Sequence, residues 1–218
     1  AADMVFCTAA GLYDTLVSYN QHTKLIPNGA DYPLFAQAAQ VPHQRDPQKP
    51  IFGFVGMLQD CIAYDFLLAL SDAFPEGEIR LIGRVMPGVD ITALQQKDNI
   101  CLLGLLPQDK LPQEIGQFDV CLNLFAPGRL SKDVSPLKFY EYLATGKPIV
   151  STTEPLQVTD YADIVYIADN IDDFISKCRL ALAENDPDLV KARMAAGEAA
   201  SWDNRVRQME DCLRERGI

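Results

Sequence analysis

The sequence predicts a doubly wound parallel α/β sheet with an N-terminal appendage and C-terminal helices. Two observations support this prediction. From about residue 50 onward, short β-rich apolar segments alternate with segments of helical apolar spacing, which is typical of successive strand–helix units. The apolar segments are also almost continuously hydrophobic, as strands of a parallel sheet are when helices cover both faces.

Each element follows from its local pattern. The first strand, IFGFVG at 51–56, is a short apolar run ending in glycine, and the helix at 62–74 ends before Pro75. Similar apolar runs predict further strands at 78–83, 99–104, 119–125, 147–152 and 163–168. Helical spacing predicts helices at 109–117, 136–145 and 171–184, followed by C-terminal helices at 187–199 and 202–216.

Two segments lie outside this alternation. Residues 3–26 have the pattern of a strand, a helix and a short strand, and a Pro/Gln-rich linker at 40–50 precedes the sheet. The chain therefore divides into a leading segment 1–47, a main domain 48–200 and a C-terminal helix 201–218. The chain does not begin with Met, which predicts a processed chain or an excised piece.

Composition excludes several classes of protein. The formal net charge of −11 argues against nucleic-acid binding and against attraction to anionic lipid. No run approaches the roughly 18 consecutive apolar residues of a membrane span, and the N-terminus does not resemble a signal peptide. The six cysteines include no C-x-x-C pair and no nearby histidine, which predicts buried free thiols in the cytoplasm and no metal site.

The segment SPLKFYEYLATGKPIVST, starting at Ser135, carries the predicted chemistry. Ser135 is a good N-cap and Pro136 suits the first helical position, so a helix is expected to begin there. Lys138 and Glu141 follow Ser135 along one line of that helix, and six residues rise roughly 9 Å, about the length of a ribose-phosphate unit. Apolar residues on the neighbouring face are expected to pack on the sheet: Leu137, Tyr140, Leu143 and Ala144.

This line of residues suits a nucleotide. Free backbone N–H groups at the helix start, with Lys138 beside them, can hold a phosphate, and Glu141 can accept two hydrogen bonds from a ribose diol. In a doubly wound fold such a helix start lies at the carboxyl edge of the sheet, where ligands bind. The alternative is a solvated Lys138–Glu141 surface pair, which on spacing alone is the commoner arrangement.

The same segment resembles the donor-binding signature of nucleotide-sugar glycosyltransferases with the GT-B fold, in the family-4-like group that builds bacterial surface polysaccharides. The resemblance extends in order along almost the whole chain. KLIPNGAD at 24–31 is similar to the hinge of such enzymes, and FGFVGML, IRLIGRV and NICLLG are similar to strands of their C-terminal half. The resemblance implies that 48–200 is the Rossmann-like donor-binding domain. It also implies that 1–47 is a remnant of the acceptor half plus the hinge. This leading segment is expected to pack loosely.

The resemblance implies roles around the helix start. Glu141 would bind the donor ribose, and the amides from Ser135 through Leu137 to Lys138 would face the diphosphate. Asp133, eight residues before Glu141, would contact the transferred sugar.

Further implied contacts come from the ends of strands. The Gly56 loop would let the backbone approach the phosphates, and main-chain groups of Gly104 and Leu105 would meet the base. Many relatives have an arginine directly after that glycine and a lysine a few residues on, where this chain has Met57 and no cation at 59–63. Diphosphate binding is therefore expected to rest on the helix-start amides and on three cations: Lys138, Arg129 and Arg84.

The implied activity is transfer of a sugar, with retention, from a nucleotide diphosphate sugar to a glycan or lipid-linked acceptor, without a metal or another cofactor. The missing half would hold the acceptor, so this chain alone is expected to be inactive and no catalytic residue is assigned. Peripheral membrane contact through the missing half stays open.

Two other classes remain as alternatives. A nucleotide-sugar epimerase shares the GT-B architecture, and a non-catalytic nucleotide-sugar or partner-binding domain would explain the missing arginine. A dinucleotide oxidoreductase is disfavoured, because no G-x-G-x-x-G follows the first strand.

Overall fold

The computed structural model describes residues 2–126, 128 and 133–217, and every structural statement below concerns this part of the chain. Six parallel strands form the central sheet, in the order β5-β4-β3-β6-β7-β8. The strands are β3 (Ile51–Val55), β4 (Glu78–Ile82), β5 (Ile100–Gly104), β6 (Val120–Asn123), β7 (Ile149–Thr152) and β8 (Tyr166–Ala168). The predicted doubly wound sheet is confirmed, and its topological switch point lies between β3 and β6.

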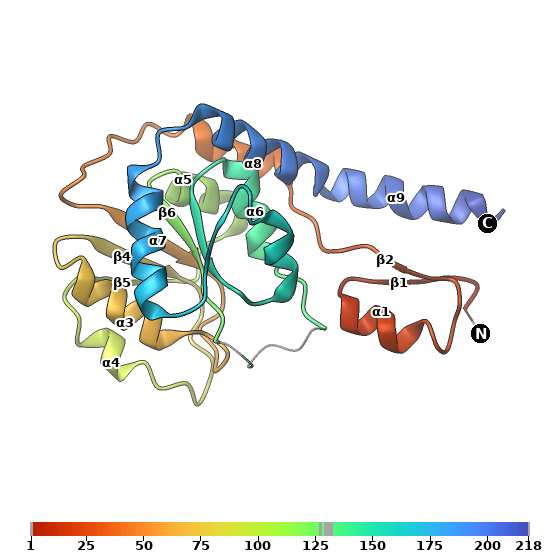
Figure 1. The fold of residues 1–218 in the computed structure, drawn as a ribbon, viewed down its shortest axis with the longest axis horizontal. Helices are drawn as coiled ribbons and strands as arrows, with labels where there is room; N and C mark the ends of the chain where they lie inside the picture. Colours follow the sequence, from red (N-terminus) through yellow and green to blue (C-terminus); the bar gives the residue numbers. More distant parts are fainter. Residues whose placement is uncertain (1, 127, 129–132, 218) are drawn as a thin grey trace.

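Helices cover both faces of this sheet (Figure 1). The helices of the main body are α3 (Tyr64–Ala73), α4 (Thr92–Gln95), α5 (Leu111–Ile115), α6 (Leu137–Thr145), α7 (Ile171–Ala183) and α8 (Pro187–Ala199), with short 3-10 turns η2 (Gln108–Lys110) and η3 (Leu156–Tyr161). On one face, Leu67 of α3 and Phe174 of α7 are fully buried in one apolar cluster. On the other face, Ile115 of α5 and Leu143 of α6 belong to a second cluster.

The leading segment divides into two parts. The elements β1 (Val5–Cys7), α1 (Ala10–Leu16) and β2 (Thr23–Leu25) form a small unit whose two parallel strands pair with each other and not with the main sheet. This unit and the C-terminal helix α9 (Trp202–Glu215) extend to the same side of the main body (Figure 1). The next elements, α2 (Tyr32–Phe35) and η1 (Ala36–Gln40), were not predicted, and they pack on the main body through the fully buried Phe35.

Several predicted boundaries are wrong by a few residues. The strand predicted at 163–168 covers three residues, and the one predicted at 119–125 ends at Asn123. The helix predicted at 109–117 is divided between η2 and α5, and the short α4 was not expected. The domain limits at 47 and 200 stay a prediction.

Candidate functional site

Helix α6 begins at Leu137, one residue later than predicted. Pro136 has an extended conformation (φ −78°, ψ 103°), so the first helical residue is Leu137. The Ser135 hydroxyl oxygen instead accepts a hydrogen bond of 3.1 Å from the Asn28 backbone N–H. The prediction that Ser135 caps this helix is therefore wrong: its side chain ties the hinge segment to the entrance of α6.

The predicted apolar face of α6 is correct apart from its first residue. Tyr140, Leu143 and Ala144 are buried, whereas Leu137 is 38% exposed. Leu137 lies in the first turn, beyond the edge of the sheet, and its side chain faces two cavities described below. The expected packing of Leu137 on the sheet is wrong.

Glu141 is a buried carboxylate that faces a cavity. Its side chain is 2% exposed, whereas that of Lys138 is 30% exposed, and Lys138 Nζ lies 2.7 Å from Glu141 Oε2. Among the described residues, Oε2 nevertheless accepts no hydrogen bond of normal geometry. Burial raises the pKa of Glu141, and the charge of Lys138 opposes this rise without cancelling it. The Lys138–Glu141 pair thus exists, but it is not the solvated surface pair of the alternative prediction.

The backbone at the ends of β3 and β4 is held close together beside Glu141. Gly56 N–H donates to Ile82 O at 2.9 Å. Gly83 has a φ of +151°, and a Cβ at this position would lie 1.8 Å from Gly56 O, so this approach requires glycine. The Val55 N–H donates to the Tyr142 hydroxyl oxygen at 2.7 Å, which fixes the end of β3 to α6.

These elements enclose a cavity of about 270 Å³, which we call the Glu141 cavity. Its lining combines three strand-end loops with the first turns of α6: Val55, Gly56, Met57, Ile82, Gly83, Arg84, Leu105, Leu106, Gln108, Leu111, Leu137, Lys138 and Glu141. Most of these side chains are apolar and a few are polar or charged, as in typical small-molecule sites.

A second cavity of about 390 Å³, the Asn123 cavity, adjoins the first. The two share Val55, Gly56, Met57, Leu137 and Lys138. The Asn123 cavity is also lined by Phe54, Gln59, Ile62, Leu122, Asn123, Phe125, Val134, Ser135, Pro136 and Tyr142. Since it lies between the carboxyl ends of β3 and β6, it occupies the topological switch point, where doubly wound folds bind ligands.

The structure brings most of the predicted site residues together. Six of them line the Glu141 cavity: Gly56, Arg84, Leu105, Leu137, Lys138 and Glu141. Ser135 lines the Asn123 cavity. Asp133 and Gly104 line neither cavity, although Gly104 O accepts the Gly83 N–H at 2.8 Å. Arg129 lies outside the described residues.

Several lining residues were not predicted from the sequence. Asn123 is a polar residue within an otherwise apolar strand, and it is buried with its amide donating to Ser151 Oγ at 2.8 Å. Its position in DVCLNLF was a usable signal. Gln108 and Gly83 gave no such signal, because their placement depends on how the three strand ends meet.

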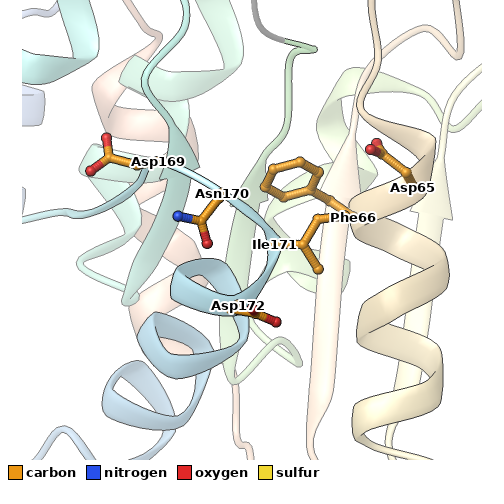
Figure 2. A pocket seen from close by; sticks show the side chains of 6 residues that line it. All are labelled: Asp65, Phe66, Asp169, Asn170, Ile171 and Asp172. Carbon is orange, nitrogen blue, oxygen red and sulfur yellow. The ribbon is translucent and has the colours of Figure 1, made fainter.

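A third hollow, of about 600 Å³, lies where α3 and α7 begin (Figure 2). We call it the acidic hollow, because Asp65, Asp169 and Asp172 line it together with Phe66, Asn170 and Ile171. Within the described residues, no group of three or more His, Cys, Asp or Glu side chains is arranged to hold a metal ion. The like charges of the acidic hollow disfavour a diphosphate, so the cation-bearing cavities around Lys138 are the better candidates.

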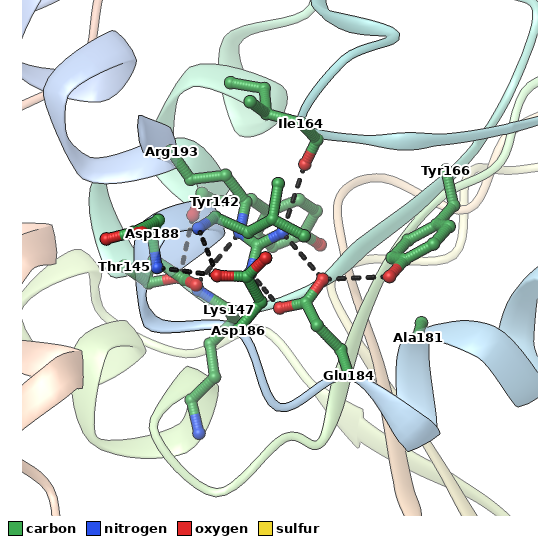
Figure 3. A network of polar contacts seen from close by, with 12 residues as sticks. Tyr142, Thr145, Lys147, Ile164, Tyr166, Ala181, Glu184, Asp186, Asp188 and Arg193 are labelled. Atoms are coloured by element: carbon green, nitrogen blue, oxygen red, sulfur yellow. Dashed lines mark hydrogen bonds and ion pairs between the residues drawn. The ribbon is translucent and has the colours of Figure 1, made fainter. Parts of the chain in front are cut away.

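The far end of α6 is anchored by a buried arginine (Figure 3). Arg193 of α8 is fully buried; it donates to Gly146 O at 3.0 Å and Ile164 O at 3.1 Å. Its guanidinium also binds both carboxylate oxygens of Glu184, one of them at 3.0 Å. Gly146 ends α6 in the left-handed conformation (φ 71°). This network fixes the orientation of the helix that carries Lys138 and Glu141.

All six cysteines lie in the described part and are free. None of the described helices is long and apolar enough to cross a membrane.

The fold and the cavities define a class: a Rossmann-like α/β domain with the architecture of one half of a GT-B glycosyltransferase. The comparisons with known proteins agree with this class. No protein-family model matches the chain. The chain is 23% identical over 221 residues to a putative teichuronic acid biosynthesis glycosyltransferase, TuaH, of Bacillus subtilis, and the match covers 95% of this chain and 56% of that protein.

Solved structures show the same architecture. Anabaena HepE in complex with UDP superposes with a TM-score of 0.77 at 14% identity, covering 98% of this chain and 64% of HepE. Sucrose-phosphate synthase from Thermosynechococcus elongatus superposes with a TM-score of 0.73 at 21% identity, covering 99% of this chain and 58% of the synthase. The resemblance stated from the sequence is thus confirmed for the fold, and the chain spans little more than half the length of these relatives.

Proposed function

We propose that the chain is the donor-binding part of a glycosyltransferase. In this proposal it binds a nucleotide diphosphate sugar, from which the intact enzyme transfers the sugar, with retention, to a glycan or lipid-linked acceptor. The observation that carries the proposal is the buried Glu141 carboxylate, which faces a cavity at the carboxyl edge of the sheet with Lys138 beside it.

Each part of the donor has a proposed location. The ribose diol binds Glu141, because a carboxylate accepts two parallel hydrogen bonds. The base lies among the apolar residues of the Glu141 cavity, near Leu105. The diphosphate lies near Gly56 and the N–H groups at the start of α6, with Lys138, Arg84 and Arg129 as the proposed cations. Asp133 is proposed to contact the transferred sugar.

The relatives support the donor and acceptor classes. HepE has been solved with UDP and with UDP-glucose, which favours a nucleotide sugar as the ligand of the same fold. TuaH is described as a putative teichuronic acid biosynthesis glycosyltransferase, which favours a role in surface polysaccharide synthesis. Free cysteines favour a reducing compartment such as the cytoplasm.

A calorimetric screen tests the proposal. UDP, GDP, ADP and their sugar derivatives are titrated into the chain at fixed ionic strength, followed by the best ligand after EDTA treatment. Saturable binding of at least one nucleoside diphosphate, unchanged by EDTA, is expected. Absence of binding to every nucleotide would exclude the donor-site proposal, and binding that needs added Mn²⁺ would contradict its metal-free form.

A further inference from the structure

Lys138 has two possible partners in the proposed donor site, the Glu141 carboxylate and the diphosphate. We propose that Lys138 is a phosphate-dependent gate on the ribose subsite: its ammonium occupies Glu141 in the ligand-free chain, and a nucleoside diphosphate draws it away. Glu141 then accepts the ribose hydroxyls fully only when the phosphates are present. This inference rests on the proposed donor-binding function and adds a mechanism by which the site selects nucleoside diphosphates over nucleosides.

In the ligand-free chain, the ammonium of Lys138 occupies the position of a ligand hydroxyl at Glu141. Lys138 Nζ lies 2.7 Å from Glu141 Oε2, which is the distance at which a hydroxyl donor of a ligand would also lie. A bidentate contact with a vicinal diol uses both carboxylate oxygens. Oε2 is buried, with less than 1 Å² of accessible surface, so a ribose hydroxyl reaches it only when the neighbouring Lys138 moves aside.

The second argument is that Lys138 can leave. Its side chain is 30% exposed, whereas Glu141 is 2% exposed, so the lysine can exchange the carboxylate for water or for a ligand. Lys138 Nζ also lies 5.9 Å from the centroid of the Phe35 ring, a contact that does not fix the ammonium in one position.

The third argument is where Lys138 can go. Its side chain lines both the Glu141 cavity and the Asn123 cavity. Among the described residues, the lining of the Asn123 cavity contains no carboxylate side chain, and Lys138 is its charged member. Among the described lining residues, Lys138 is therefore the cation that this cavity offers to an anion at the start of α6. A lysine has a flexible stem of four carbons, which allows this rotation without movement of the helix.

The competing arrangement is a fixed pair. If Lys138 stays on Glu141 and the ribose uses the remaining oxygen, ribose and phosphate contribute independently to binding. The gate instead makes them depend on each other, because the phosphate releases the carboxylate that the ribose needs. A thermodynamic cycle on the ligand separates these two arrangements in the unmodified protein.

The test compares four ligands by ligand-observed NMR and calorimetry at pH 8. They are the best-binding nucleoside diphosphate, its nucleoside, and the 2′-deoxy form of each. The gate predicts that loss of the 2′-hydroxyl weakens the diphosphate by at least about tenfold and the nucleoside by less than about threefold. Equal weakening of both would overturn the gate while leaving the donor site intact. Failure of every diphosphate to bind would overturn the donor site as well.

A variant gives the second readout. In Lys138→Met the carboxylate is never occupied, so the nucleoside should bind more tightly than to the wild type while the diphosphate binds more weakly. Lys97→Met is the control, because Lys97 is 32% exposed, pairs with the exposed carboxylate of Asp72, and lines neither cavity. This control should change neither affinity. Nucleoside binding that is equally weak, or too weak to measure, in both wild type and Lys138→Met would contradict the gate.

Discussion

Replacing Glu141 with glutamine keeps the shape of the side chain and removes its charge, so it separates a binding role from a structural one. Hydrogen bonds to a charged group contribute about 1.5–3 kcal/mol each. Nucleoside diphosphate affinity should therefore fall at least about tenfold, or roughly 1.4 kcal/mol. The calorimetric titration that defines wild-type binding measures this loss directly.

The stability of the same variant should move in the opposite direction. Glu141 is 2% exposed and its partner Lys138 is 30% exposed, so the two halves of the pair are desolvated unequally. A buried ion costs several kcal/mol of desolvation, whereas a lysine that loses its partner can turn toward water at a cost of about 1 kcal/mol or less. Glu141→Gln should thus unfold with a free energy equal to or above that of the wild type at pH 8. Lys138→Met, which leaves the carboxylate buried without its cation, should lose stability, by up to about 3–5 kcal/mol.

The stability difference between the wild type and Glu141→Gln should depend on pH. Burial raises the pKa of Glu141 above its ordinary value of 4.5, so the folded state disfavours the ionised form. Below the ordinary value, the carboxyl is protonated in both folded and unfolded states and the wild type keeps its full stability. As pH rises through the raised value, the wild type should lose stability relative to Glu141→Gln. Urea unfolding at several pH values measures the difference.

The matched control is Glu184→Gln. Glu184 is 4% exposed and pairs with the fully buried Arg193, outside the Glu141 cavity. This control should lose stability and keep its nucleotide affinity per folded molecule. If Glu141→Gln behaved in the same way, unstable and unchanged in binding, Glu141 would be a structural residue and the reasoning above would be refuted.

Three further outcomes follow from the same geometry. Arg193→Met should lose about 3–5 kcal/mol in urea unfolding, because it leaves Glu184 as a buried charge without its partner; a loss below about 1 kcal/mol would contradict the anchoring role. Gly83→Ala should weaken nucleotide binding and cost at least about 2 kcal/mol, since its Cβ would lie 1.8 Å from Gly56 O at a φ of +151°; wild-type affinity and stability would contradict it. Nucleotide affinity should fall on acidification from a pH above 4.5, because protonation of Glu141, whose pKa is raised, removes the acceptor charge. An affinity that does not change down to pH 4.5 would count against the ribose contact.

The sequence predicted the sheet well because the information is local. Near-continuous apolar runs such as IFGFV and VCLN are typical of central parallel strands, whose side chains are buried on both faces of the sheet. The position of Glu141 beside strand-end glycines also followed, since parallel strands end at one edge. Strand boundaries were less predictable, because they depend on which backbone groups find partners in neighbouring strands.

Other features depend on contacts between distant segments. The Ser135 hydroxyl was available both for capping α6 and for binding the hinge, and the contact with Asn28, far away in the sequence, decided between them. The burial of Glu141 could not be inferred from an i,i+3 pair, because an identical spacing at Lys191 and Asp188 gives an exposed pair. The two cavities likewise arise where loops from β3, β4, β5 and β6 meet α6.

The central claim is that a nucleoside diphosphate binds at the start of α6. Chemical-shift mapping of the isotope-labelled chain during titration with the best-binding nucleoside diphosphate tests it most directly. We expect saturable shifts to concentrate at Gly56, Gly83, Leu105 and residues 137–141, and to spare the acidic hollow around Asp169 and Asp172. Shifts concentrated at the acidic hollow, or scattered without saturation, would contradict it.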